Sequence, residues 1–401
     1  MERTIILKGG AVYTSRMRLD GGSLVISGRY IRDVLAASEA PLPGDDAEVI
    51  DVSGHIVAPG FIDIHVHGGG GADTSERDRE AIVRMSRAHV RFGTTLMLPT
   101  IYPGPWKEMI GAINAVEAAM KEQSPGARIH GINMEGPFLN PGKAGALRSD
   151  CLIEPSEEAF LQLVAASDNN IRLITIAPEL PGAIHIIKMC RERGIRTAVG
   201  HSDASHEEMI LGINAGINHV THVFNALRRT HHRDPGVMGT ILINDEITVE
   251  LIADFFHVHP AVVVLLIKVK PNDKIALITD SLKITGLPGD TFEADGRSVR
   301  VRDGLVYLDD DTIAGSVLTM NRAVANVVST GLVPLEEALK MASLVPAKIL
   351  GVQHHKGTLT PGSDADLVVM DKDFNVKLTM VEGKVVYCSD DSPWALRLKD
   401  G

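Results

Sequence analysis

Apolar runs of strand length alternate with stretches of helical periodicity through the middle of the chain. Eight such runs occur, and helical patterns separate most of them. Continuous apolar runs of this length are typical of parallel strands that are covered by helices. The alternation predicts an α/β fold, a (β/α)8 TIM-like barrel, over residues 55–353. The expected strands are Ile56–Ile64, Thr95–Pro99, Ile129–Met134, Arg172–Ala177, Arg196–Val199, His219–His222, Thr248–Ala253 and Lys274–Thr279.

The helices expected between these strands have recognisable ends. Ser156 is a plausible N-cap residue, and Gly194 is suited to the position just after a helix. Residues 286–313 interrupt the rhythm with short strands and Gly/Asp turns, which predicts a β-hairpin insertion. The clearest helical patterns are Glu76–Phe92, Trp106–Gln123, Ser156–Ala166, Pro181–Arg193 and Ser205–Ala215, and two more, Leu318–Thr330 and Pro334–Leu350, are expected to close the barrel.

The two ends of the chain have a different pattern, with short alternating strands between Gly, Asp and Pro turns. Neither end contains enough strands to make a stable sheet alone. We therefore expect residues 1–54 and 354–401 to pair into one small β-sandwich domain formed by both chain termini.

Composition excludes several classes of protein. The chain has 401 residues, and 51 acidic against 40 basic residues give a net charge of −11, with no long basic block, so a nucleic-acid partner is not expected. The longest apolar run, Ala261–Ile267, is too short to cross a bilayer, so no membrane partner is expected either. The N-terminus lacks a signal-peptide pattern, and three distant cysteines fit a reducing compartment, which predicts a cytoplasmic protein.

Polar residues follow the predicted strands at the points where the strands end. His65 and His67 are two positions apart, so their imidazoles point to the same side of a strand, as in half of a metal site. The C-terminal ends of barrel strands open on one face, where the chemistry of such folds takes place. The other residues placed in this way are Glu135, His201, His222, Asp254 and Asp280.

Each of these residues also has an ordinary structural interpretation. Chance predicts roughly 0.6 His-x-His pairs in a chain with this many histidines, and a second pair occurs at His257 and His259. Glu135 could form a salt bridge or cap a helix, and His201 and His222 could be hydrogen-bonded core residues. Their shared placement at strand ends favours a metal site, because neutral imidazole is a good ligand for zinc or iron.

Two further groups suggest roles beside the metal ligands. Asp280 is either an N-cap residue or a general base that takes a proton from the attacking water. Arg233 follows His231 and His232 in a loop that suits a phosphate or carboxylate, or is simply solvated.

Several motifs together resemble the N-acetylglucosamine-6-phosphate deacetylase branch of the amidohydrolase superfamily. The resemblance runs over nearly the whole chain, and Glu135-Gly-Pro is the motif most specific to this branch. The motifs are Pro59–Gly68, Met134–Leu139, Gly200–Asp203, Thr221–Ala226, Arg233–Gly236, Thr279–Asp280, Ala314–Ser316 and Lys356–Val368.

The resemblance implies one or two divalent metal ions per subunit (Zn, Fe, Co or Mn) and a homodimer. Glu135, His201 and His222 would hold the main ion, and His65 and His67, with Glu135 and Asp280, a second. Arg233 would reach the phosphate of the substrate in the neighbouring subunit. The expected substrate contacts are Ala146, Leu147, Asn225, Ala226, Arg233, His257, Ile313, Ala314 and Gly315.

The activity implied by the resemblance is removal of the N-acetyl group from a phosphorylated N-acetyl amino sugar. Asp280 would move the proton from water to the departing amine, and His257 would donate to the carbonyl oxygen. Two departures from the family pattern concern the sugar: Leu147 stands where a histidine is usual, and Phe255 where glycine is usual. They keep open a related substrate such as N-acetylgalactosamine-6-phosphate. A catalytically silent binding module is the other class, and the complete set of ligand-type residues argues against it.

Overall fold

Eight parallel strands form a barrel in the computed structural model, which describes residues 3–39, 47–122, 125–289, 291–294, 297–302, 305–308 and 312–395. β16 returns to β6 through backbone bonds, with Asp280 N donating to His65 O at 2.9 Å and His67 N donating to Ser281 O at 3.0 Å. The predicted barrel of eight strands is therefore confirmed. In order around the barrel the strands are β6 (Phe61–Val66), β9 (Thr94–Ile101), β11 (Ile132–Met134), β12 (Ile171–Ile176), β13 (Arg196–Val199), β14 (His219–Val220), β15 (Thr248–Ile252) and β16 (Ile275–Ile278).

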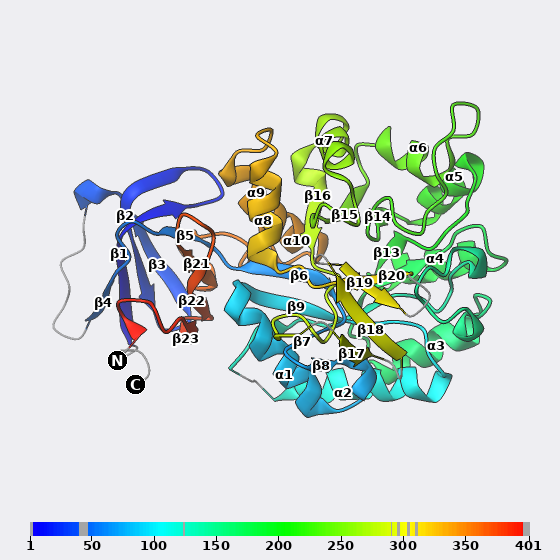
Figure 1. The fold of residues 1–401 in the computed structure, drawn as a ribbon, viewed down its shortest axis with the longest axis horizontal. Coiled ribbons are helices and arrows are strands. Elements are labelled where there is room, and N and C mark those ends of the chain that lie inside the picture. Colours follow the sequence, from blue (N-terminus) through cyan, green and yellow to red (C-terminus); the bar gives the residue numbers. More distant parts are fainter. Residues whose placement is uncertain are drawn as a thin grey trace.

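The expected helices surround this barrel (Figure 1). Ser156 caps α3, where its hydroxyl accepts from Ala159 N, and Gly194 follows α4 with a φ of +70°. The helix expected over Pro334–Leu350 is two helices broken at Ser343, because Pro346 is tolerated only in the first turn of a helix. The helices are α1 (Arg79–His89), α2 (Trp106–Lys121), α3 (Glu157–Ala166), α4 (Ala183–Glu192), α5 (His206–Ala215), α6 (Gly236–Leu242), α7 (Pro260–Val269), α8 (Met320–Ser329), α9 (Leu335–Ala342) and α10 (Leu344–Ile349).

Both ends of the chain contribute to one eight-stranded sheet at the side of the barrel (Figure 1). Residues from its N-terminal and C-terminal strands share a separate apolar core that includes Leu24, Val57 and Leu367. The predicted pairing of the two termini into a small β-domain is confirmed. The strands are β1 (Thr4–Tyr13), β2 (Arg18–Ser27), β3 (Tyr30–Leu35), β4 (Ala47–Asp51), β5 (Ile56–Pro59), β21 (Leu367–Met370), β22 (Val376–Val381) and β23 (Lys384–Cys388).

The first predicted strand, Ile56–Ile64, was wrong in one respect, because it is two strands in two sheets. β5 pairs with β21 in the terminal sheet, and β6 begins the barrel. Gly60 lies between them, where a Cβ atom would come within 2.2 Å of the Thr95 side chain. The chain therefore changes sheets at a residue with no room for a side chain, a change that continuous hydrophobicity conceals.

A buried cluster of charges lies at the junction of the terminal sheet and the barrel. Lys356 Nζ lies 2.8 Å from Asp364 and 2.6 Å from Asp366, and Arg29 lies 2.6 Å from Asp364. Glu382 accepts a hydrogen bond from Arg128, which lies four residues before barrel strand β11. These contacts explain why the C-terminal motif around Lys356 combines buried acidic and basic residues.

The predicted hairpin insertion is a four-stranded antiparallel sheet whose last strand extends to Ser316. Its strands are β17 (Thr291–Ala294), β18 (Arg297–Arg302), β19 (Leu305–Leu308) and β20 (Ile313–Ser316), and residues 295–296, 303–304 and 309–311 of the connecting turns lie outside the described residues. The sheet lies across one end of the barrel (Figure 1).

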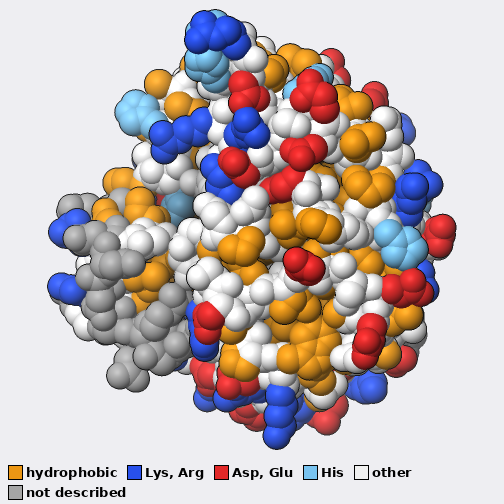
Figure 2. Space-filling model, turned by 90° about the vertical axis from the view of Figure 1, so that its right-hand side faces the viewer, with side chains coloured by type: hydrophobic (Ala, Val, Ile, Leu, Met, Phe, Trp, Pro, Cys, Tyr) orange, Lys and Arg blue, Asp and Glu red, His pale blue; other side chains and the backbone are white. Residues whose placement is uncertain are grey.

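The right-hand face of the molecule carries interspersed acidic and basic side chains, with Lys, Arg and His gathered at its upper edge (Figure 2). Such mixing is unlike the continuous basic surface of a nucleic-acid-binding face. Within the described residues, no helix is both long and apolar enough to cross a membrane.

Candidate metal centre and active-site cavity

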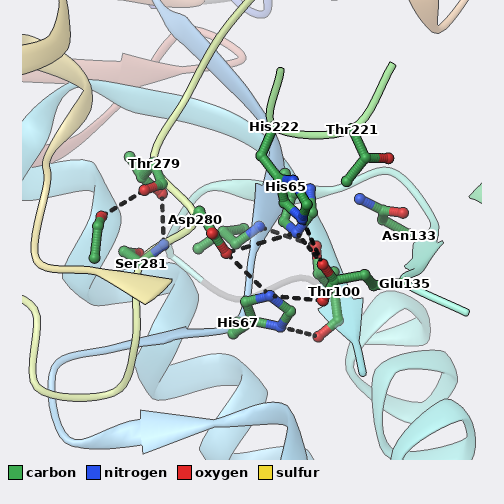
Figure 3. A network of polar contacts seen from close by, with 12 residues as sticks. His65, His67, Thr100, Asn133, Glu135, Thr221, His222, Thr279, Asp280 and Ser281 are labelled. Carbon is green, nitrogen blue, oxygen red and sulfur yellow. Dashed lines mark hydrogen bonds and ion pairs between the residues drawn. The ribbon is translucent and has the colours of Figure 1, made fainter. Parts of the chain in front are cut away.

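All six predicted metal ligands converge at the C-terminal ends of the barrel strands. They are buried and lie in or around a cavity of about 250 Å³. Each comes from the end of a strand: His65 and His67 from β6, Glu135 from β11, His201 from β13, His222 from β14 and Asp280 from β16. Figure 3 shows the side chains of His65, His67, Glu135 and Asp280 directed toward one another.

Glu135, His201 and His222 form one group of possible ligands. Glu135 Oε1 lies 3.0 Å from His201 Nε2 and 2.9 Å from His222 Nε2, and these two nitrogens are 3.1 Å apart. Two ligands of one tetrahedral zinc ion would be about 3.3 Å apart, given metal–nitrogen distances near 2.0 Å. The spacing of the three atoms therefore suits a shared metal ion.

His65, His67 and Asp280 form a second group beside the first. Asp280 Oδ1 lies 3.1 Å from His67 Nε2 and 3.6 Å from His65 Nε2. His65 Nε2 is fully buried and has no hydrogen-bond partner among the described residues. Glu135 Oε2 lies 3.4 Å from His67 Nε2, so the Glu135 carboxylate has one oxygen toward each group. This arrangement could hold two ions with Glu135 between them.

The outer nitrogens of three of these histidines are held by oxygen acceptors. His67 Nδ1 lies 3.2 Å from Thr100 O, His201 Nδ1 lies 2.9 Å from Lys143 O, and His65 Nδ1 lies 2.9 Å from Glu250 Oε2. An Nδ1–H that donates to oxygen leaves Nε2 with its lone pair free to bind a metal. The surroundings thus select the tautomer that a ligand needs.

Glu250 contacts two of the candidate ligands, His65 and His222, and was not predicted from the sequence. Its carboxylate is fully buried on β15 and also accepts from His219 Nε2 at 3.1 Å and from the backbone N of His222 at 3.1 Å. Burial raises the pKa of Glu250, but the charges and hydrogen bonds of His65 and His219 outweigh burial and bring it to about 2. A charged residue inside an apolar strand is the signal that could have identified it.

Backbone strain is concentrated at the same ligands. His201, His222 and Asp280 have φ values of +47°, +27° and +51°, in the left-handed region that favours glycine. Such conformations cost about 1–3 kcal/mol each and accumulate at functional sites. The strands thus end in turns that aim these side chains into the cavity at the expense of local stability.

The electrostatics of the cavity favour added positive charge. Burial lowers the pKa of His67, but the carboxylates of Asp280 and Glu135 outweigh burial and raise it to about 10. Burial also lowers the pKa of His65, but the charge and hydrogen bond of Glu250 and the charges of Asp280 and Glu135 outweigh burial and raise the pKa to about 9. A site that raises the proton affinity of buried imidazoles also attracts a divalent cation, which displaces those protons. The donor set of four imidazoles and two carboxylates therefore fits a divalent transition metal.

His257 lines the cavity and is held by Asp254. Its Nδ1 lies 2.6 Å from Asp254 Oδ2, while Asp254 Oδ1 accepts from the backbone of Phe256 and His257. Burial lowers the pKa of His257, but the Asp254 hydrogen bond and charge outweigh it and raise the pKa. The remaining ring nitrogen, Nε2, is the one available to a bound molecule.

Phe255, which stands where the family usually has glycine, is not part of the cavity lining. It keeps the left-handed conformation, with a φ of +68°, and packs against the core of the barrel. The neighbouring Phe256 lines the cavity instead. The turn after β15 therefore keeps the geometry that glycine would adopt, with the strain that a bulky residue brings.

The structure places eight of the nine predicted substrate contacts on the cavity wall and one outside it. Arg233 lies on an exposed loop, where its guanidinium is 2.7 Å from His232. The eight that line the cavity are Ala146, Leu147, Asn225, Ala226, His257, Ile313, Ala314 and Gly315, and the lining residues that the sequence analysis did not name include Asp73, Tyr102, Arg148, Phe256, Leu282, Val299 and Leu308. Val299 and Leu308 belong to the insertion, and Leu282 precedes it. No local sequence pattern indicates that the insertion packs on the barrel.

Comparisons with known proteins find a family model and relatives that cover most of the chain. The amidohydrolase family model matches residues 56–386. N-acetylglucosamine-6-phosphate deacetylase of Bacillus subtilis (strain 168) is 33% identical over 395 residues, which cover 98% of this chain and 99% of that protein. N-acetylgalactosamine-6-phosphate deacetylase of Escherichia coli O157:H7 is 32% identical and covers 95% and 99%. The crystal structure of N-acetylglucosamine-6-phosphate deacetylase from Pasteurella multocida superposes with a TM-score of 0.90 at 31% identity, covering 96% and 100%.

Proposed function

Because this chain belongs to the amidohydrolase family, and within it to the N-acetylglucosamine-6-phosphate deacetylases, we propose that it hydrolyses the N-acetyl group of N-acetylglucosamine-6-phosphate. The products would be glucosamine-6-phosphate and acetate. The observation that carries the proposal is the convergence of four histidines and two carboxylates beside His257 in one cavity. A family likeness alone would not require these side chains to meet.

We assign the main metal site to Glu135, His201 and His222, and a second site to His65 and His67 with Glu135 and Asp280. A divalent ion bound there would polarise the amide carbonyl and make a water molecule more acidic. Zinc, iron, cobalt and manganese all suit these ligands, and zinc is the first choice on the tetrahedral spacing of the main site.

Asp280 acts as the general base and then as the general acid. Its pKa is lowered, because the His67 hydrogen bond and the nearby histidine charges outweigh burial, so it is ionised and ready to accept a proton. It takes a proton from the water that attacks the carbonyl carbon, and delivers it to the nitrogen as the C–N bond breaks. Amines leave poorly unless protonated, so both transfers are needed.

His257 stabilises the negative charge that develops on the carbonyl oxygen. Asp254 fixes its ring and raises its pKa, which favours a protonated, donating Nε2. The substrate would be held by Asn225, the backbone of Ala226 and the segment Ile313–Gly315, all of which line the cavity.

We place the enzyme in the cytoplasm and expect it to form a homodimer. Arg233 supports the homodimer, because its side chain is exposed and lies outside the cavity of its own subunit. This position suits a contact with the phosphate bound by a neighbouring subunit. A guanidinium donates two parallel hydrogen bonds to a phosphate, so it is well suited to this contact.

A second candidate substrate is N-acetylgalactosamine-6-phosphate. It is favoured by the 32% identity to the deacetylase of that name and by Leu147, which places an apolar side chain on the cavity wall. A site that lacks a hydrogen-bond donor toward a sugar hydroxyl discriminates weakly between epimers at that hydroxyl.

The deciding experiment measures acetate release by metal-replete enzyme from the two phosphorylated sugars and from unphosphorylated N-acetylglucosamine. We expect fast release from N-acetylglucosamine-6-phosphate. Faster release from the galacto epimer would transfer the assignment to the second candidate. No release from any of the three, with metal demonstrably bound, would refute both.

A further inference from the structure

A second hollow lies at the end of the barrel opposite to the metal centre. It has a volume of about 540 Å³ and is lined by residues at the N-terminal ends of β12, β13 and β14 and by the end of α10. We call it the basal hollow and define it by Arg172, Arg191, Arg196 and His130. Its lining, which lies wholly in the described part of the chain, contains no Asp or Glu.

The three arginines of the basal hollow make hydrogen bonds to neutral oxygens only. Arg196 donates from two nitrogens to Ile349 O, at 2.8 and 3.2 Å. Arg172 donates to His130 O at 3.3 Å and to Asn170 Oδ1 at 2.9 Å, and Arg191 makes one long bond of 3.4 Å to Asn214 O. Within the described residues, none has a carboxylate oxygen within 4.0 Å. Each guanidinium has five N–H donors, so several remain for a ligand.

Glycines make room for two of these side chains. A Cβ atom at Gly131 would come within 2.4 Å of Arg172 Cγ, and one at Gly216 would come within 3.2 Å of Arg191 Cβ. Gly194 and Gly351, also in the lining, have open space beside them. The hollow is therefore kept open where the arginines lie.

The electrostatic environment of the basal hollow is positive. Burial, followed by the charges of Arg172 and Lys356, lowers the pKa of His130 to about 4. Burial also lowers the pKa of Arg196, with no carboxylate contributing to the shift. Arg172 is within electrostatic reach of Glu117, but Arg196 is withdrawn from water without a counter-ion, and an anion in the hollow would relieve this cost.

A structural role explains Arg196 and Arg172, which hold backbone and amide oxygens, but not Arg191. Arg196 satisfies the last carbonyl of α10, a usual role for a cation at a helix C-terminus. Arg191 is exposed and its single bond is long, so it adds little to the stability of the fold. Residues at this end of a barrel usually serve stability, and Arg191 does not fit that role.

We propose that the basal hollow is an anion-binding site for a small phosphate-bearing molecule, either inorganic phosphate or a sugar phosphate. Arginine is the residue best suited to phosphate, because its planar fork donates two parallel hydrogen bonds. The site is separate from the catalytic cavity and does not depend on the substrate proposed above.

Calorimetric titration of the metal-replete protein with inorganic phosphate, and separately with glucosamine-6-phosphate, tests this site. We expect a binding component that weakens about tenfold in Arg191→Gln and more in the double variant Arg172→Gln/Arg191→Gln. The component should persist in Glu135→Ala, which excludes the metal ions as its source, and its loss in the arginine variants excludes the catalytic cavity, which those arginines do not line.

The matched control is Arg322→Gln. Arg322 is exposed and likewise donates only to a backbone carbonyl and an amide oxygen, but it lies outside the hollow. Phosphate affinity should be unchanged in this variant. Binding of either probe that is lost with the hollow arginines and kept in the control supports the site, and the probe that binds more tightly identifies the source. Absence of binding by both probes, or equal binding by the control and the double variant, would overturn the proposal. If the double variant fails to fold, Arg191→Gln and Arg191→Glu decide alone, because Arg191 is exposed.

Discussion

The replacement of Glu250 by alanine tests whether a buried carboxylate that touches no substrate controls the metal centre. Glu250 accepts from His65 Nδ1 at 2.9 Å, and this bond keeps a proton on Nδ1 when a metal ion displaces the proton of His65 Nε2. Without Glu250 the proton of His65 is no longer held on Nδ1, and the ring can turn. We therefore expect weaker metal binding although all six ligands remain.

The size of the effect follows from the contacts that are lost. A hydrogen bond to a charged group contributes about 1.5–3 kcal/mol. If most of the free energy of the His65–Glu250 hydrogen bond stabilises the metal-bound protein, its loss lowers the affinity for metal by about 10-fold to 100-fold. This is the range found for residues that orient metal ligands. Glu250→Gln should have a smaller effect. The amide oxygen can still accept from His65, while the amide nitrogen can donate to His219, whose other nitrogen lies 2.7 Å from Thr248 Oγ1.

The assay is competition for metal with a chelator of known affinity, followed by elemental analysis of the protein. Circular dichroism of the apo-protein establishes that each variant is folded. An order of affinity of wild type, then glutamine, then alanine is expected. An alanine variant that is folded and binds metal as tightly as the wild type would falsify the role assigned to Glu250.

Substitutions at three other charged groups test the remaining roles. Asp280→Asn should keep the metal held by Glu135, His201 and His222 but reduce kcat by about 10²-fold to 10⁴-fold, because the proton carrier is lost; retained turnover would contradict the assignment. Glu135→Ala should lose the main metal ion, and full metal content by elemental analysis would refute its role as a ligand. Lys356→Met should destabilise the fold by about 3–5 kcal/mol in urea unfolding at pH 7, because buried carboxylates lose their partner. In the wild type, burial raises the pKa of Asp364 but the Arg29 and Lys356 contacts outweigh it and lower the pKa. The lowered pKa of Asp364 therefore stabilises the fold at neutral pH, and this contribution is lost as the pH falls below about 4. Lys356→Met should lose less free energy of unfolding than the wild type when the pH is lowered through this range. An equal loss in both proteins would argue against the cluster.

The identity of the ligands could be predicted from the sequence because each one lies within two residues of the end of a strand. A strand end is a local feature, visible in the change from apolar residues to His65, Glu135, His201 or Asp280. The direction of a parallel barrel then places these ends on one face without further information. Helix ends such as Ser156 were predictable for the same reason, since a cap depends on its near neighbours.

The missed features all depend on contacts between distant parts of the chain. Glu250 bonds to a histidine 185 positions away, and the insertion places Val299 and Leu308 on the cavity wall. The division of the first predicted strand into β5 and β6 depends on pairing with β21, which lies more than 300 residues later. Apolar residues continue from β5 into β6, so hydrophobicity does not indicate where the chain passes from one sheet to the other.

The sequence by itself determined the order of strands and helices, the kinds of metal-binding side chain and the face on which they gather. Only the tertiary structure decided the distances at which the ligands meet, which oxygens hold the outer nitrogens of His65, His67 and His201, and that Glu250 lies beside them. The physical reason is that periodicity records which side of each element is buried, whereas hydrogen-bond partners and distances are set only when the barrel closes and brings the strand ends together.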